Sequence, residues 1–136
     1  MQHYKLFKKA GEPTHATPLN LCQSTRERLK LWQRIPVEQM QQELRQDIER
    51  LDRFEYLVTD DAGELQAMMV IDSDHNPHYG SYLYPRYSFS AEKGLLSGGY
   101  KWINELAKTL KFDGFQITRQ TGDYEITSKF KRLITS

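Results

Sequence analysis

A glycine-rich turn ahead of an amphipathic helix carries the clearest chemistry in this chain of 136 residues. The turn, Gly94-Leu95-Leu96-Ser97-Gly98-Gly99, follows an aromatic, strand-like run from Tyr82 to Ser90 and leads into the helix pattern from Tyr100 to Leu110. The first amides of a helix lack partners within the helix, and the helix dipole adds positive potential at the same end. Such a turn predicts an anion site, usually for a phosphate. The alternative is a flexible loop before a helix.

The hydrophobic pattern divides the chain into the elements that must position this turn. Strands are predicted from Gln2 to Lys9, Phe54 to Val58, Leu65 to Ile71, Tyr79 to Ser90 and Phe112 to Thr118. Three helices are predicted. The first follows a capping box at Ser24-Thr25-Arg26-Glu27, and the second runs from Val37 to Leu51. The third runs from Tyr100 to Leu110 and has one apolar face, formed by Trp102, Ile103, Leu106 and Leu110. Pro85 marks a bulge, a bend or an edge, because proline cannot donate to a ladder. The tail from Tyr124 to Ile134 fits a strand or a helix, and the turn Thr121-Gly122-Asp123 favours a strand.

This order of elements indicates an α+β fold, with a central, mostly antiparallel sheet flanked by about three helices. A length of 136 residues fits a single domain, 1–136. The sequence has no apolar run of membrane-spanning length, and its start lacks the apolar core of a signal peptide. A single cysteine, Cys22, excludes an internal disulfide and fits a reducing compartment, so we expect a cytoplasmic protein without membrane contact.

Charge is distributed unevenly along the sequence although the net charge is only +1, which argues against nucleic acid as a partner. The segment from Val37 to Glu64 carries nine acidic residues and three basic ones. From Lys93 onward eight basic residues face four acidic ones. The last third therefore favours an anionic ligand and the middle a cationic one, although a solvated helix face explains the acidic segment equally well.

A polar segment, Asp72 to Pro77, carries residues that ligate metals elsewhere: Asp72, Asp74, His75, Asn76 and, just beyond, His78. Its start resembles a calcium loop, but Pro77 stands where glycine is required and Leu83 where the closing glutamate belongs. We therefore expect a solvated loop and no metal site.

The order of elements resembles the GNAT superfamily of acetyl-coenzyme A-dependent N-acetyltransferases over nearly the whole chain. The family's acyl-CoA loop reads Arg or Gln, two residues, Gly, one residue, then Gly or Ala. Gly99 fits the last position, but Gly94 stands where Arg or Gln is expected and Ser97 stands where the first glycine is expected. The runs Tyr100 to Ala107 and Ile117 to Tyr124 further resemble small GNAT-like proteins of tailed bacteriophages. The family's usual fourth helix and last two strands are expected to be cut short here.

The resemblance implies direct acyl transfer from acetyl-CoA to an unknown amine or protein acceptor. The cofactor-binding residues are then expected to be Lys93, Gly94, Ser97, Gly98, Gly99 and Tyr100, with the diphosphate on backbone amides. A break at Pro85 would open the gap for the pantetheine arm. Tyr124 is the candidate acid, and Glu92 and His78 are the candidate bases.

The resemblance also leaves a second function open. A catalytically silent copy of the fold would act as a virion-associated protein or bind a phage or host protein. The expected location is the cytoplasm, which would be the host's if the chain is phage-encoded, or the virion in the second case.

Overall fold

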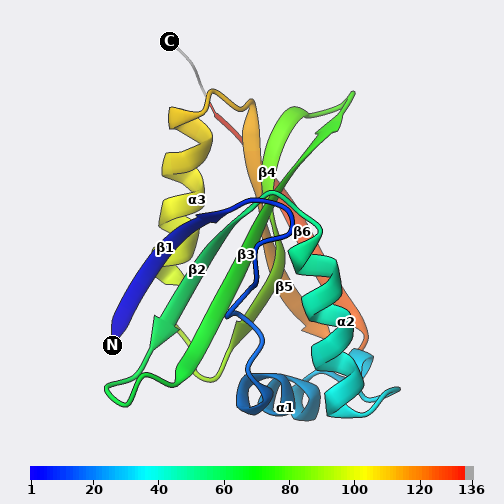
Figure 1. Cartoon of the computed structure of the whole chain (residues 1–136). Coiled ribbons are helices and arrows are strands. Elements are labelled where there is room, and N and C mark those ends of the chain that lie inside the picture. Colours follow the sequence, from blue (N-terminus) through cyan, green and yellow to red (C-terminus); the bar gives the residue numbers. More distant parts are fainter. Residues whose placement is uncertain (134–136) are drawn as a thin grey trace.

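Six strands form one mixed sheet whose spatial order follows the sequence (Figure 1). The computed structural model describes residues 1–133. The strands are β1 (Gln2–Lys8), β2 (Arg53–Thr59), β3 (Leu65–Asn76), β4 (Gly80–Ser90), β5 (Gly114–Gly122) and β6 (Glu125–Arg132). All neighbours run antiparallel except β4 and β5, which are parallel. The expected α+β fold with a mostly antiparallel sheet is confirmed.

Helices cover both faces of this sheet. They are α1 (Leu19–Arg28), a short 3-10 helix η1 (Lys30–Trp32), α2 (Val37–Glu49) and α3 (Ser97–Thr109). On α2 the residues Met40, Leu44 and Ile48 recur every four positions, so they share one buried face. They pack with α1 and with alternate strand residues such as Met68. On the opposite face, Ile103 and Ala107 of α3 pack with the other strand set, which includes Met69.

The two parallel strands separate soon after they meet. Only Tyr82 pairs with Gly114 and Leu83 with Phe115, although β4 continues to Ser90. On its other side β4 stays paired with β3, where the register shifts opposite Pro85. The proline therefore marks a bulge, as one of the three predicted alternatives. The result is an open gap between the carboxyl ends of β4 and β5.

Several predicted boundaries are wrong at the first helix and at the hairpin between β3 and β4. Helix α1 begins at Leu19 behind Pro18, so the predicted capping box lies inside it, and the Ser24 hydroxyl donates to the Leu21 carbonyl. Strand β3 continues to Asn76, because residues 72–76 pair with β4 instead of forming a loop. The hydrophobic pattern missed this arm because its side chains are polar.

The C-terminal third differs less from prediction. Helix α3 begins at Ser97, three residues earlier than predicted, and Leu110 lies beyond its end, 48% exposed. Strand β5 begins at Gly114 and runs to Gly122. The strand interpretation of the tail is confirmed by β6, while Ile134 lies outside the described residues.

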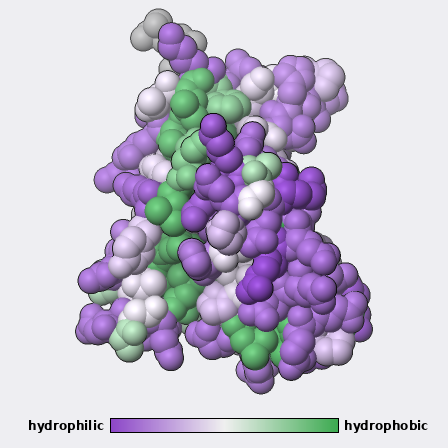
Figure 2. All heavy atoms as spheres, viewed as in Figure 1, coloured by the Kyte–Doolittle hydropathy of each residue, from purple (hydrophilic) through white to green (hydrophobic). Residues whose placement is uncertain are grey.

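The face of the molecule drawn in Figure 2 carries mostly hydrophilic residues. In the orientation of Figure 1, apolar residues show as a narrow band between broader hydrophilic areas (Figure 2). Among the helices of residues 1–133, none has both the length and the apolar character needed to cross a membrane.

Candidate functional site

A cleft of about 680 Å³ occupies the gap where β4 and β5 separate. One wall is the end of β4, from Tyr84 to Ser90, and the opposite wall comes from β5 and β6. Helix α1 and η1 border it on one face of the sheet, and Leu96 and Tyr100 of the α3 start border it on the other. The Tyr100 hydroxyl donates a 3.0 Å hydrogen bond to the Thr118 carbonyl, which joins α3 to β5 at this wall.

The lining of the cleft is positively charged. Among residues 1–133 it contains four arginines, Arg28, Arg34, Arg86 and Arg119, and neither a carboxylate nor a histidine. Arg86 is ion-paired with Asp47 and Asp72, which lie outside the lining, so the positive charge comes chiefly from the other three arginines. Arg28 donates to the carbonyls of Ser90 and Ala91, so it joins α1 to the end of β4. The Arg34 guanidinium lies 5.9 Å from the centre of the Trp32 ring. A lining of this composition favours an anionic ligand.

Two buried hydroxyl groups in the cleft lack hydrogen-bond partners. The Thr25 Oγ1 and Ser88 Oγ atoms are both shielded from solvent and unpaired among the described residues, and Thr25 is only 6% exposed. Ser88 lies opposite Met69, so it faces the α3 side of the sheet, whereas Thr25 comes from α1. Unpaired buried hydroxyls are costly, but neither oxygen is presented at the surface of the cleft, so a ligand there would reach them only after the two side chains rotate.

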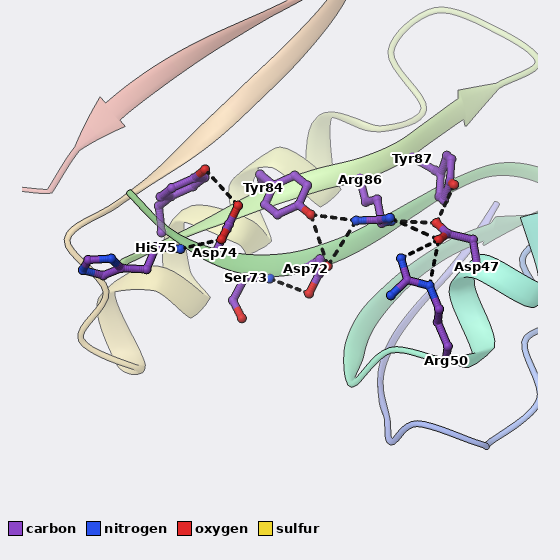
Figure 3. A network of polar contacts seen from close by, with 10 residues as sticks. Asp47, Arg50, Asp72, Ser73, Asp74, His75, Tyr84, Arg86 and Tyr87 are labelled. Atoms are coloured by element: carbon purple, nitrogen blue, oxygen red, sulfur yellow. Dashed lines mark hydrogen bonds and ion pairs between the residues drawn. The ribbon is translucent and has the colours of Figure 1, made fainter. Parts of the chain in front are cut away.

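A polar network fixes Arg86 beside the bulge (Figure 3). Its Nε lies 2.7 Å from Asp47 Oδ2 of α2, and its Nη1 donates at 2.9 Å to the Tyr84 hydroxyl. The Tyr84 hydroxyl donates at 3.2 Å to Asp72 Oδ2 of β3. This network joins α2 to β3 and β4, so it holds one wall of the cleft in place.

The protonation of this network follows from its contacts. Burial alone would raise the pKa of Asp47, but hydrogen bonds from Arg86, Tyr87 and Arg50 outweigh it and hold the pKa well below its usual range. Burial, together with the hydrogen bond to Asp47, raises the pKa of Tyr87 to about 12. Burial and the Asp72 charge likewise raise the pKa of Tyr84. Both phenols therefore keep their protons at neutral pH.

The glycine-rich turn meets only part of the expectation for an anion cradle. The Ser97 amide donates to the Gly94 carbonyl at 3.4 Å, and the Tyr100 amide donates to the Leu96 carbonyl at 3.1 Å. The amides of Gly98 and Gly99 have no protein acceptor within residues 1–133. Two of the four expected donors are thus unpaired. Gly98 and Gly99 lie in sequence between the cleft residues Leu96 and Tyr100, but neither glycine lines the cleft, and Gly99 is buried.

Packing against β2 explains why both positions are glycine. A Cβ atom on Gly98 would lie 2.2 Å from the Tyr56 hydroxyl oxygen. One on Gly99 would lie 3.0 Å from Cδ1 of the same ring and 3.3 Å from the Met69 methyl carbon. The glycines let α3 approach the sheet, whatever ligand the turn holds.

The predicted acid and base residues lie outside the cleft. Tyr124 is 70% exposed in the turn between β5 and β6. His78 is exposed in the turn before β4, and Glu92 is exposed after its end. They are separated by the eleven residues of β4, about 33 Å of strand, so His78 and Glu92 cannot serve one reaction centre together. Lys93 and Gly94 are exposed and lie outside the cleft lining, as do Ser97, Gly98 and Gly99. Of the six predicted cofactor-binding residues, only Tyr100 lines the cleft.

Sequence reasoning missed the arginines of the cleft and Tyr84. Arg86 and Tyr84 flank Pro85, so the predicted break in β4 was a usable signal for both. Arg28 and Arg34 had no comparable signal, because the first helix was predicted in the wrong place. Comparisons of the chain with models of protein families, with curated proteins and with solved structures find no match.

Proposed function

We propose that this chain binds acetyl-CoA as a GNAT-like domain and transfers the acetyl group to an amine. The observation that carries the proposal is the arginine-lined cleft at the point where the parallel strands β4 and β5 separate. Its volume of about 680 Å³ lies in the range of small-molecule sites. A thioester arm would pass between the strands, where their facing edges are unpaired.

The cleft offers separate groups for the polar parts of this ligand. Free amides of Gly98 and Gly99 at the start of α3 would take the diphosphate, supported by the charge of Arg119. The buried hydroxyls of Thr25 and Ser88 would pair with amide or hydroxyl groups of the ligand once their side chains rotate toward the cleft. The backbone of each of these residues is already positioned by its helix or strand.

Transfer joins the amine nitrogen to the thioester carbonyl carbon and breaks the carbon–sulfur bond. The amine gives up a proton to water, since no carboxylate or histidine of residues 1–133 lines the cleft. The leaving sulfur takes a proton, and the Tyr84 hydroxyl is the donor we propose, because it lines the cleft and is protonated at neutral pH; the phenolate would regain its proton from water. Tyr84 takes this role in place of the exposed Tyr124.

Thermal unfolding with and without acetyl-CoA tests binding. A ligand at about 100 times its dissociation constant adds about 2.7 kcal/mol of stability, which raises the unfolding temperature by several degrees. Release of free thiol from acetyl-CoA in the presence of a panel of amines then tests transfer. Tyr84→Phe should keep the thermal shift and lower thiol release. An unchanged unfolding temperature at saturating acetyl-CoA would refute the proposal.

One observation favours a second candidate, a silent copy of the fold in a virion-associated or host-protein-binding role. In the part of the chain that the structure describes, no carboxylate or histidine that could act as a base lines the cleft. This candidate is supported if acetyl-CoA stabilises the protein but no amine in the panel releases thiol.

A further inference from the structure

Strand β6 has a free edge that is unusually well exposed. Within the described residues it is the last strand of the sheet, with β5 as its neighbour on one side and no strand on the other. Seven of its eight residues are exposed and one, Phe130, is half-buried. Two large apolar side chains lie at its start, Tyr124 with 70% exposure and Ile126 with 53%. An exposed strand edge with apolar side chains is a template for pairing with another strand.

The sequence of β6 is complementary to itself in one antiparallel register. In a two-fold pair centred on Ser128, each Glu125 lies opposite Lys131 of the second copy, and each Ile126 lies opposite Phe130. Directly opposed residues share a face and have Cβ atoms about 5 Å apart, so two ion pairs and two apolar pairs form. This register uses seven of the eight β6 residues. Glu125 keeps an oxygen free for this contact, because only its Oε1 accepts a bond from Thr121.

We propose that two copies of the chain pair antiparallel along β6, centred on Ser128, into one continuous sheet of both subunits. The other sheet edge makes a useful contrast. Strand β1 carries Lys5 and Lys8 and no acidic residue, so self-pairing there would bring only like charges together. Only the β6 edge thus carries charges that are complementary to those of a second copy, so we assign the pairing to β6 and not to β1.

The pairing would also extend the wall of the cleft. Ile126 and Ser128 both line the cleft, and in this register each lies directly opposite a residue of the second copy. The second copy's Phe130 would lie beside Ile126, so each cleft gains an apolar surface from its partner. The pairing itself depends only on β6 and does not require acetyl-CoA binding.

A charge-exchange series tests the register. Sedimentation velocity over a wide range of concentration should give the unmodified chain twice the mass of one 16.0 kDa copy. Glu125→Lys alone and Lys131→Glu alone each create two like-charge pairs and should weaken the dimer at least about tenfold. The double variant restores opposite charges and should restore the dimer. Lys5→Glu on β1 is the matched control and should change nothing.

A disulfide trap tests the two-fold axis directly. Ser128→Cys places two thiols opposite each other, and the native Cys22 is buried, so oxidation should link two copies through position 128. Lys129→Cys, opposite Thr127, should link poorly. A single-copy mass at all concentrations, or a dimer indifferent to both single charge changes, would overturn the proposal.

Discussion

Replacing Gly98 by alanine separates the two reasons for a glycine at the start of α3. The added Cβ would lie 2.2 Å from the Tyr56 hydroxyl oxygen, far inside contact distance. The Tyr56 ring cannot move aside freely, since Tyr56 is 2% exposed and its hydroxyl lies 2.5 Å from His3 Nδ1. Overpacking of this kind costs about 1–3 kcal/mol, and the better helix propensity of alanine returns about 0.5–1. We expect a net loss of about 1–2 kcal/mol in the free energy of unfolding.

A double-mutant cycle, followed by urea unfolding, measures the free-energy cost of the clash between the added Cβ and the Tyr56 hydroxyl. Tyr56→Phe removes the clashing oxygen, and the nearest ring carbon then lies 3.2 Å from the new Cβ, so Gly98→Ala should cost much less in that background. Gly122→Ala, whose Cβ would meet only ordinary contact at 3.5 Å, is the control and should stay within about 0.5 kcal/mol. The packing explanation would be refuted if Gly98→Ala lowered the free energy of unfolding equally in the unmodified chain and in the Tyr56→Phe variant. The double variant keeps the Gly98 amide position, so it should still bind acetyl-CoA.

Three further predictions address the network, the cysteine and the cleft. Asp47→Asn should destabilise by about 1–2 kcal/mol at neutral pH. Because the pKa of Asp47 is lowered in the folded state, the difference in free energy of unfolding between the two proteins should persist above about pH 5 and narrow as the pH falls below about 4. Urea titrations at each pH measure this difference. Burial raises the pKa of the Cys22 thiol to about 11, so an aromatic disulfide reagent at pH 8 should react only after unfolding, and rapid labelling of folded protein would contradict its placement. Arg119→Glu should weaken acetyl-CoA binding about tenfold by calorimetry, whereas Lys5→Glu, across the sheet, should not.

The sequence predicted the sheet well because its signals are local. Alternating runs in β2 and the start of β3, and the four-residue spacing along α2, depend on burial of one face, which tertiary structure rarely overrides. Pro85 was informative for the same reason, since a residue without an amide hydrogen is restricted to a bulge, a bend or a strand edge. The error at α1 has a physical cause as well. Ser24 and Glu27 match a capping box, but the same residues tolerate the interior of a helix that Pro18 starts earlier.

The candidate site was harder to predict because it is assembled by distant elements. The cleft depends on where two parallel strands part, and the sequence does not encode that distance in any single motif. The acidic segment predicted a cationic ligand, yet its carboxylates lie outside the cleft lining, and Asp47 instead holds Arg86 in place. Residues chosen for being near β4 in sequence, such as His78 and Glu92, were separated by the full length of that strand.

Amide chemical shifts of the isotope-labelled chain, recorded during titration with acetyl-CoA, test the central claim that this cleft is an anionic-ligand site. We expect the largest changes at the free amides of Gly98 and Gly99 and at Ser88 and Arg119 around the gap, with β1 unaffected. Saturating acetyl-CoA that leaves these four signals unmoved, or that moves chiefly those of β1 and β2, would contradict the assignment.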